Sequence, residues 1–141
     1  MRLVKIFNEG KVINETLYEK LQALDDICFP GAEGEFQKNR DWWVCCIDGE
    51  IIAYCGCIYS YDLCIFNRAW VHKSFRGRGL QRKMIKARLK AAIGRCNLAV
   101  TYTMSNNLVS ANNLIKSKFL LYTPSWKWAG NDCLYFCKNV R

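Results

Sequence analysis

The chain has 141 residues and a net charge of +9, and 51% of its residues are hydrophobic and 13% aromatic. These values predict one globular domain over residues 1–141 and exclude a disordered chain. No apolar run reaches the ~18 residues that a membrane-spanning helix needs, and the charged start of the chain is too short for a signal peptide. We therefore expect a cytoplasmic protein.

Hydrophobic periodicity and turn residues predict a strand, a helix and a hairpin in the first half of the chain. Leu17, Leu21, Leu24 and Ile27 recur at helical spacing, and Pro30-Gly31 follows them. The elements expected there are a strand at 3–7, a helix at 16–28, a loop or short helix at 33–41, and a hairpin of strands 42–47 and 51–59.

The second half alternates strands and helices. The expected elements are strands at 63–71, 98–103, 120–122 and 134–137, with helices at 80–93 and 108–116. Asn106 or Asn107 would cap the second of these helices. Strands followed by strand–helix–strand–helix–strand predict an α/β fold with a mixed sheet flanked by helices, without linkers or repeats.

Charge is unevenly distributed along the chain. Every Asp and Glu except Asp132 lies at or before Asp62, whereas thirteen Lys and Arg lie between residues 63 and 131. Such asymmetry predicts a polyanionic ligand or partner. Part of it forms a stripe on one face of the helix at 80–93: Arg82, Lys83, Lys86 and Lys90. The stripe is either a solvated helix surface or an electrostatic footprint for nucleic acid.

The nine cysteines form an odd set without a secretory signal, which predicts reduced and mostly buried thiols. Cys55 and Cys57 would point to one face of a strand. Because no CxxC pair or His cluster accompanies them, we expect no metal site.

The loop before the helix at 80–93 carries the sequence Arg76-Gly77-Arg78-Gly79-Leu80-Gln81. Glycines let the backbone approach a ligand closely, and the first amides of the following helix favour an anion. The Walker pattern is absent, and the dinucleotide pattern fails because Arg82 stands at its third glycine. The loop therefore predicts a site for a ligand with a diphosphate.

This loop resembles the acetyl-CoA motif of the GNAT superfamily of N-acetyltransferases, Arg/Gln-x-x-Gly-x-Gly/Ala. Arg76, Gly79 and Gln81 occupy its three fixed places, and Gln81 departs from the usual small residue.

A later stretch resembles the second signature of the family, Asn-x-x-Ala/Ser followed by Tyr-x-Lys-x-Gly-Phe. Asn107 and Ser110 match its start, and Leu114 stands where many members carry Tyr, Lys118 where they carry Gly. The C-terminal segment is similar to small acetyltransferase-like proteins of bacteriophages and bacteria.

The resemblance implies a GNAT fold, with a mixed, mostly antiparallel sheet flanked by helices. It also implies an acetyl-CoA-dependent enzyme that moves an acetyl group to a primary amine of a small molecule or protein by direct attack. Acetyl-CoA would lie in a splay between the strands at 63–71 and 98–103. The residues implied to bind it are Val71, Arg76, Gly77, Arg78, Gly79, Leu80, Gln81 and Asn107. Family members often pair, so a homodimer is also implied.

The acid that protonates the leaving thiolate is usually a tyrosine at the position of Leu114, which cannot serve. The remaining candidates are Tyr102, Tyr122 and Tyr135, and we rank Tyr122 first because it lies just beyond the late motif. A thiolate can also leave without a dedicated acid.

The base that deprotonates the amine would be a carboxylate from the first 62 residues or Asp132. We rank Glu33 and Glu35 ahead of Asp62, because the loop after the first helix often borders the acceptor site in this family. His72 has a suitable unperturbed pKa near ~6.5, but we expect it to be structural.

Three functions remain open. The first is the N-acetyltransferase described above, and the second is a related enzyme that acts on a tRNA-linked amine or a nucleic-acid-bound protein. The third is a non-catalytic GNAT-fold binding protein.

Overall fold

The computed structural model describes residues 2–8, 10–30 and 40–140. Its elements in chain order are β1 Leu3–Asn8, β2 Lys11–Val12, α1 Glu15–Cys28, β3 Arg40–Ile47, β4 Glu50–Ser60, β5 Leu63–Val71, the 3-10 turn η1 Lys73–Phe75, α2 Leu80–Ala92, β6 Leu98–Met104, α3 Leu108–Lys116, β7 Leu120–Tyr122 and β8 Cys133–Asn139. The predicted strands and the helices at 16–28, 80–93 and 108–116 are confirmed to within two residues at each end, whereas β2 and η1 were not predicted. Of the loop or short helix expected at 33–41, residues 33–39 lie outside the described residues, and Arg40 and Asp41 belong to β3 instead.

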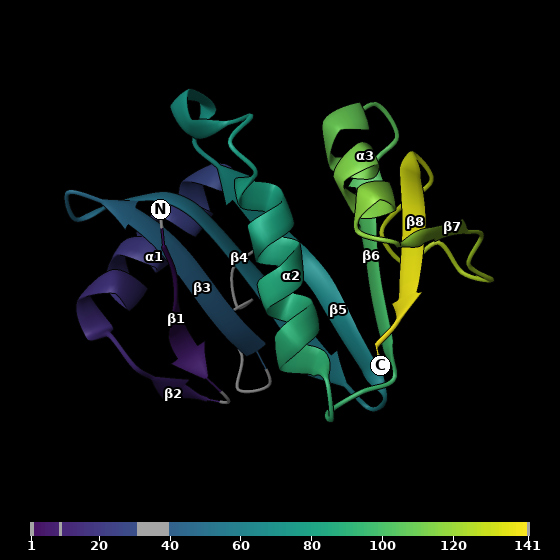
Figure 1. Ribbon diagram of the computed structural model, residues 1–141, viewed down its shortest axis with the longest axis horizontal. Helices are drawn as coiled ribbons and strands as arrows, with labels where there is room; N and C mark the ends of the chain where they lie inside the picture. The colour runs from purple at the N-terminus through teal and green to yellow at the C-terminus, as the bar shows by residue number, and fades with distance from the viewer. Residues whose placement is uncertain (1, 9, 31–39, 141) are drawn as a thin grey trace.

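The strands form one eight-stranded sheet in the order β2-β1-β3-β4-β5-β6-β8-β7 (Figure 1). Among the described residues, only β5 and β6 pair in parallel, and the other neighbouring strands pair antiparallel. This arrangement confirms the predicted mixed, mostly antiparallel sheet flanked by helices.

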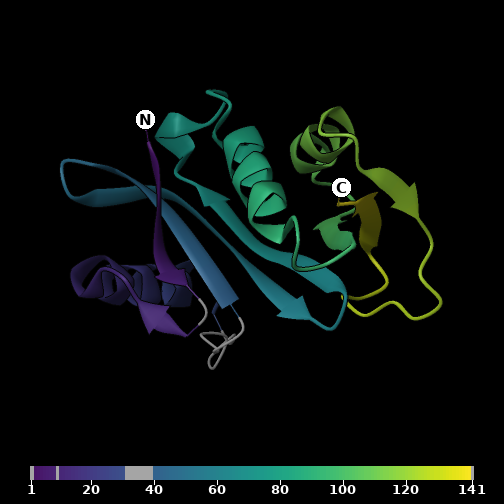
Figure 2. The same ribbon diagram turned by 60° about the horizontal axis from the view of Figure 1, so that its bottom comes forward.

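The helices cover the two faces of the sheet unequally. Helix α1 packs on β1, β3 and β4 through a core that includes Leu21, Ile6 and Trp42, whereas α2 and α3 pack on the opposite face. Figure 2 shows α1 below the sheet and the other two helices above it. Asn14 starts α1 by accepting a hydrogen bond from the Leu17 amide at 3.1 Å.

Strands β5 and β6 separate partway along their length. Their pairing runs from Leu63 opposite Leu98 to Phe66 opposite Thr101, although β5 continues to Val71 and β6 to Met104. The separation coincides with a bulge in β5, and β-bulges bend and twist the strand that carries them. The result is a wedge between the two strands that opens toward the N-terminus of α2.

The last two strands do not follow chain order across the sheet. Strand β8 lies between β6 and β7, so β7 forms the edge of the sheet and is two strands away from the wedge. Leu120 and Leu121 on β7 are exposed.

All nine cysteines are free, and five are buried, namely Cys45, Cys55, Cys57, Cys64 and Cys96. Within the described ranges, none of the helices has the length and apolar character needed to cross a membrane.

Candidate functional site

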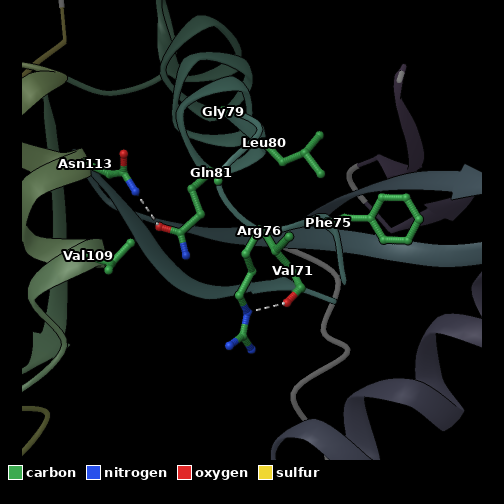
Figure 3. A pocket seen from close by; sticks show the side chains of 9 residues that line it. Val71, Phe75, Arg76, Gly79, Leu80, Gln81, Val109 and Asn113 are labelled. Atoms are coloured by element: carbon green, nitrogen blue, oxygen red, sulfur yellow. Dashed lines mark hydrogen bonds between the residues drawn. The ribbon is translucent and has the colours of Figure 1, made fainter. Parts of the chain in front are cut away.

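The loop after β5 folds back onto the end of that strand. The Arg76 side chain donates a hydrogen bond from Nε to the carbonyl oxygen of Val71, at 3.1 Å (Figure 3). Gly77 and Gly79 both have φ of +78°, a left-handed conformation that glycine adopts without strain. A Cβ built on either glycine would meet no atom of the described residues within 4 Å. The glycines are therefore needed for the backbone path, and the space in front of them is open.

The N-terminus of α2 faces this open space. The first amide to close a helical turn is that of Lys83, which donates to the Gly79 carbonyl at 3.1 Å. The amides of Leu80, Gln81 and Arg82 thus precede the first hydrogen bond within the helix, and no side chain in the described part of the chain caps the helix at Gly79. Unpaired amides at the positive end of a helix dipole suit a phosphate group.

A cavity of about 250 Å³ borders the loop and the two helices. We call it the cradle cavity, and it is lined by Val71, Phe75, Arg76, Gly77, Gly79, Leu80, Gln81, Val109 and Asn113. Seven of the eight predicted coenzyme-binding residues lie together in this region, five of them from 76 to 81 lining the cavity. Open glycines, unpaired amides and an arginine fit a diphosphate.

Arg78 and Leu80 differ from the other predicted binding residues in what their side chains contact. The Arg78 guanidinium lies 5.0 Å from the centre of the Phe75 ring, and Leu80 is buried in the core. Leu80 would contribute through its backbone amide, and Arg78 through its positive charge near the loop.

Gln81 replaces the small residue of the motif and spans the gap between α2 and α3. Its Oε1 accepts a hydrogen bond from Asn113 Nδ2 at 3.1 Å (Figure 3). The Ser110 hydroxyl lies 3.5 Å from the same oxygen. Gln81 lines the cradle cavity and also the next cavity along the wedge. Its side chain therefore stands at the boundary between the two.

This second cavity, of about 360 Å³, occupies the wedge between β5 and β6. We call it the splay cavity. Helix α2 contributes Arg88, α3 contributes Leu114, β6 contributes Tyr102 and Thr103, and Phe29 at the end of α1 reaches it from the other face of the sheet. The cavity thus connects the two faces, as a site for two substrates that approach from opposite sides requires.

Asn107 caps α3, as the sequence predicted, and it also lies in the candidate site. Its side chain caps α3 by accepting a hydrogen bond from the Ser110 amide at 3.2 Å, and it lines the splay cavity. It does not line the cradle cavity, so any contact with coenzyme A would be with the part inside the wedge.

A basic groove of about 390 Å³ lies beside Gly79, between α2 and the end of α3. Five cations line it: Arg82, Lys83, Lys86, Lys116 and Lys118. Three of the four residues of the predicted stripe belong to this groove, and α3 and the residues after it supply the other two cations.

The candidate acids are placed very differently. Tyr122 lies on β7 and packs its ring against Tyr135, so the structure does not bring it to either cavity. The Tyr135 hydroxyl donates to the Gly130 carbonyl and accepts from the Ala129 amide, which is a structural role. Tyr102 is the candidate that lines the splay cavity.

The candidate bases are only partly placed. Glu33 and Glu35 lie outside the described residues. Asp62 directly precedes β5, at the end of the strand that lies away from the wedge, and accepts two hydrogen bonds from Asn97. The His72 Nδ1 accepts a hydrogen bond from the Ser74 amide at 3.1 Å and caps η1, in agreement with the structural role expected for it.

Sequence reasoning missed a buried polar network beside the splay cavity. Asp25 on α1 accepts hydrogen bonds from the Tyr54 hydroxyl at 2.7 Å and from Arg68 Nε at 3.2 Å. The Arg68 guanidinium stacks 4.5 Å from the centre of the Phe29 ring. Burial, followed by the hydrogen bond to Asp25, raises the pKa of Tyr54.

Sequence reasoning also missed Arg88. It shares one face of α2 with Leu80, Met84, Ile85 and Ala92, all of them buried. An arginine on the apolar face of an amphipathic helix is the sequence signal that could have found it.

Comparisons with known proteins agree with this geometry. A family model described as an acetyltransferase (GNAT) domain matches residues 38–118, which is more than half of the chain. No curated protein is similar enough in sequence to count as a match.

Several solved structures share the fold. The aminoglycoside 6'-N-acetyltransferase of Enterococcus faecium is 14% identical with a TM-score of 0.71, covering 100% of this chain and 98% of that chain. An acetyltransferase of the GNAT family from Staphylococcus aureus is 13% identical with a TM-score of 0.69, covering 99% and 100%. The N-acetyltransferase PseH of Campylobacter jejuni, solved in complex with acetyl coenzyme A, is 14% identical with a TM-score of 0.59, covering 89% and 82%.

Proposed function

The chain belongs to the GNAT acetyltransferase family, and from this premise we propose that it transfers the acetyl group of acetyl-CoA to a primary amine by direct attack. The observation that carries the proposal is the continuity of the site. A diphosphate cradle at the N-terminus of α2 leads, past Gln81, into a cavity in the wedge between two parallel strands.

The residues of the cradle would hold the phosphorylated part of the substrate. Amides from Gly77 to Arg82 would donate hydrogen bonds to the diphosphate, and Arg76 would add a charge-assisted bond. Arg76 is suited to this because its Nε is already fixed by the Val71 carbonyl, which orients the rest of the guanidinium. The pantetheine arm would then follow β5 into the splay cavity.

The amine would approach from the face of the sheet that carries α1, where Phe29 lines the splay cavity. A neutral nitrogen must attack the carbonyl carbon, so its proton must pass to a base. Glu33 and Glu35 remain our candidates for that base. We propose a small-molecule amine as the acceptor, as the name of the Enterococcus faecium relative states for that enzyme.

The basic groove beside Gly79 would take the nucleotide end of coenzyme A, which carries a further phosphate. Its five cations come from two helices, and it adjoins the cradle. The same groove supports the alternative in which a nucleic acid binds the protein. However, the groove lies at the phosphate end of the site, whereas the acceptor must reach the thioester end in the wedge. A tRNA-linked amine bound along the groove would therefore be badly placed for the reaction.

Calorimetry with acetyl-CoA, followed by thiol release with a panel of amines, tests the proposal. We expect binding and amine-dependent release of coenzyme A. Binding without release for any amine would favour the non-catalytic alternative, and no binding at micromolar protein would contradict the proposed function. Salt-sensitive retention on tRNA in the absence of coenzyme A would support the nucleic-acid alternative.

A further inference from the structure

Arg88 is a buried cation at the apex of the wedge, and it is only 4% exposed. Its Nε donates to the Met84 carbonyl at 3.1 Å, and its Nη1 to the carbonyl oxygens of Gly56 at 3.4 Å and Arg68 at 3.3 Å. Gly56 and Arg68 are paired next to the bulge in β5. The guanidinium carbon lies 4.3 Å from the centre of the ring of Phe66, the last residue of β5 that pairs with β6. The charge therefore sits where the two strands part.

No carboxylate among the described residues balances this charge. The hydrogen bonds of Arg88 go to carbonyl oxygens, and no described Asp or Glu lies within ion-pair distance of it. Burying a charge costs free energy unless it is paired. A guanidinium does not escape this cost by losing its proton. An unpaired buried cation on the wall of a cavity is suited to an anion that forms or binds inside that cavity.

The family's usual acid is missing from the splay cavity, and Tyr102 is the one candidate acid among the described residues that lines it. Leu114 on α3 lines it, at the position where many family members carry the tyrosine acid. In the same cavity, Arg88 Nη2 makes no hydrogen bond to the described residues and is not fully buried. The cavity that Leu114 lines thus contains a fixed positive charge with a free donor, although the family's usual acid is absent from it.

We propose that Arg88 is a catalytic residue whose guanidinium stabilises the negative charge on the sulfur of coenzyme A, so that the thiolate leaves without a proton donor. This inference rests on the proposed function. The amine nitrogen forms a bond to the carbonyl carbon, and the carbonyl electron pair moves to oxygen. That pair returns as the carbon–sulfur bond breaks, and the electrons of the broken bond stay on sulfur. The nitrogen proton passes to the base, and Arg88 keeps its own protons throughout.

The position of Arg88 along α2 agrees with this role. At 1.5 Å per residue, Arg88 lies about 12 Å from the start of the helix at Leu80. The extended pantetheine arm covers this span between the diphosphate and the sulfur. Preorganised charges in a cavity that excludes water stabilise transition-state charge more strongly than charges in water do.

The Cys57 thiolate is an anion of the protein itself that could pair with Arg88 in place of the coenzyme A thiolate. Cys55, Cys57 and Cys64 all feel the charge of Arg88. Burial raises the pKa of Cys55, and a hydrogen bond to Cys57 together with burial raises that of Cys64, so both stay thiols. For Cys57, burial acts in the same direction, but hydrogen bonds from Cys64 and Tyr59 and the charge of Arg88 outweigh it and lower the pKa. A Cys57→Ser variant therefore belongs in the test.

The experiment compares the affinities of coenzyme A and desulfo-coenzyme A, which lacks the thiol, by calorimetry from about pH 6 to about pH 9.5. If Arg88 stabilises the thiolate, the thiol of bound coenzyme A has a lower pKa than the free thiol. The affinity for coenzyme A then rises with pH, by about tenfold for each pKa unit of difference. The ratio of the two affinities cancels the titration of phosphates and of other protein groups.

We expect this ratio to rise by about tenfold or more in the wild-type protein and in Cys57→Ser. The ratio should stay constant with pH in Arg88→Met, which keeps the side-chain volume without the charge. Arg88→Lys should keep part of the rise. Lys90→Met, on the exposed part of the same helix, serves as the control and should match the wild type.

A flat ratio in the wild-type protein would overturn the inference even if Arg88→Met failed to fold. An equal rise in wild type and Arg88→Met would place the charge elsewhere. A rise confined to Cys57→Ser would show that Cys57 neutralises Arg88, and would also overturn it. If neither coenzyme A nor desulfo-coenzyme A bound, the proposed function itself would fail. Failure of the proposed function is thus distinguished from failure of the Arg88 inference.

Discussion

Substitution of Gly79 separates the backbone role of this residue from its role in binding. Gly79 has φ of +78°, and a Cβ there meets no atom within 4 Å. The protein alone should therefore tolerate a side chain, at a conformational cost of about 1–2 kcal/mol. Asn relieves part of this cost, because its short polar side chain adopts the left-handed conformation more readily.

The variants Gly79→Asp and Gly79→Asn have nearly the same shape and differ in charge. A carboxylate about 4 Å from a phosphate charge is repelled by about 1 kcal/mol at the dielectric constant of water and by about 4 kcal/mol at a value of 20. Acetyl-CoA should thus bind the Asp variant about fivefold to several hundredfold more weakly than the Asn variant. Both should bind more weakly than the wild type, because the side chain occupies the cradle.

Gly94→Asn is the matched control. Gly94 has φ of +83°, and a Cβ added there would also have open space around it, but Gly94 follows the opposite end of α2. Calorimetry with acetyl-CoA and thermal unfolding measure the two effects separately. We expect similar losses of stability in Gly79→Asn and Gly94→Asn, with normal acetyl-CoA affinity only in the latter. Wild-type affinity in both Gly79 variants would refute the placement of the diphosphate.

Three further changes test other parts of the site and fold. Arg76→Met should weaken acetyl-CoA binding by about 1.5–3 kcal/mol, because it removes a charged donor that the Val71 carbonyl orients; an unchanged calorimetric affinity would contradict this. Gln81→Ala restores the small residue of the motif and removes the hydrogen bond to Asn113, so acetyl-CoA should bind equally or more tightly. A tenfold loss of affinity (about 1.4 kcal/mol) would instead show that the bond between Gln81 and Asn113 supports ligand binding. Burial raises the pKa of Cys55 from 9.0 to about 12, so the unfolded chain loses this proton first as pH rises. Urea unfolding should therefore show stability falling above pH 9 by about 1.4 kcal/mol per pH unit, and the fall should be smaller in Cys55→Ala.

Local sequence signals predicted most of the fold. The bounds of β5, α3 and β7 matched their elements at both ends, because hydrophobic periodicity and turn residues act over short distances. The insertion of β8 between β6 and β7 was not predicted, since strand order depends on long-range pairing. That order is the reason Tyr122, close to the late motif in sequence, lies far from the wedge in space.

The candidate site divides in the same way. The cradle could be predicted because its residues are consecutive and two glycines mark the backbone path from Val71 to the start of α2. The splay cavity could not, because it forms only when α1, α2, α3 and two strands meet. The pair of Asp25 and Arg68 becomes visible only when the burial and partners of the two residues are known, and the sequence marks Arg88 only by its place on the apolar face of α2.

A crystal structure with bound coenzyme A tests the central claim most directly. The account predicts that the diphosphate contacts the amides of Leu80, Gln81 and Arg82, and that the sulfur lies in the wedge beyond Phe66 and Thr101, within hydrogen-bonding reach of Arg88. A diphosphate bound away from the start of α2, or a sulfur outside the wedge, would contradict it.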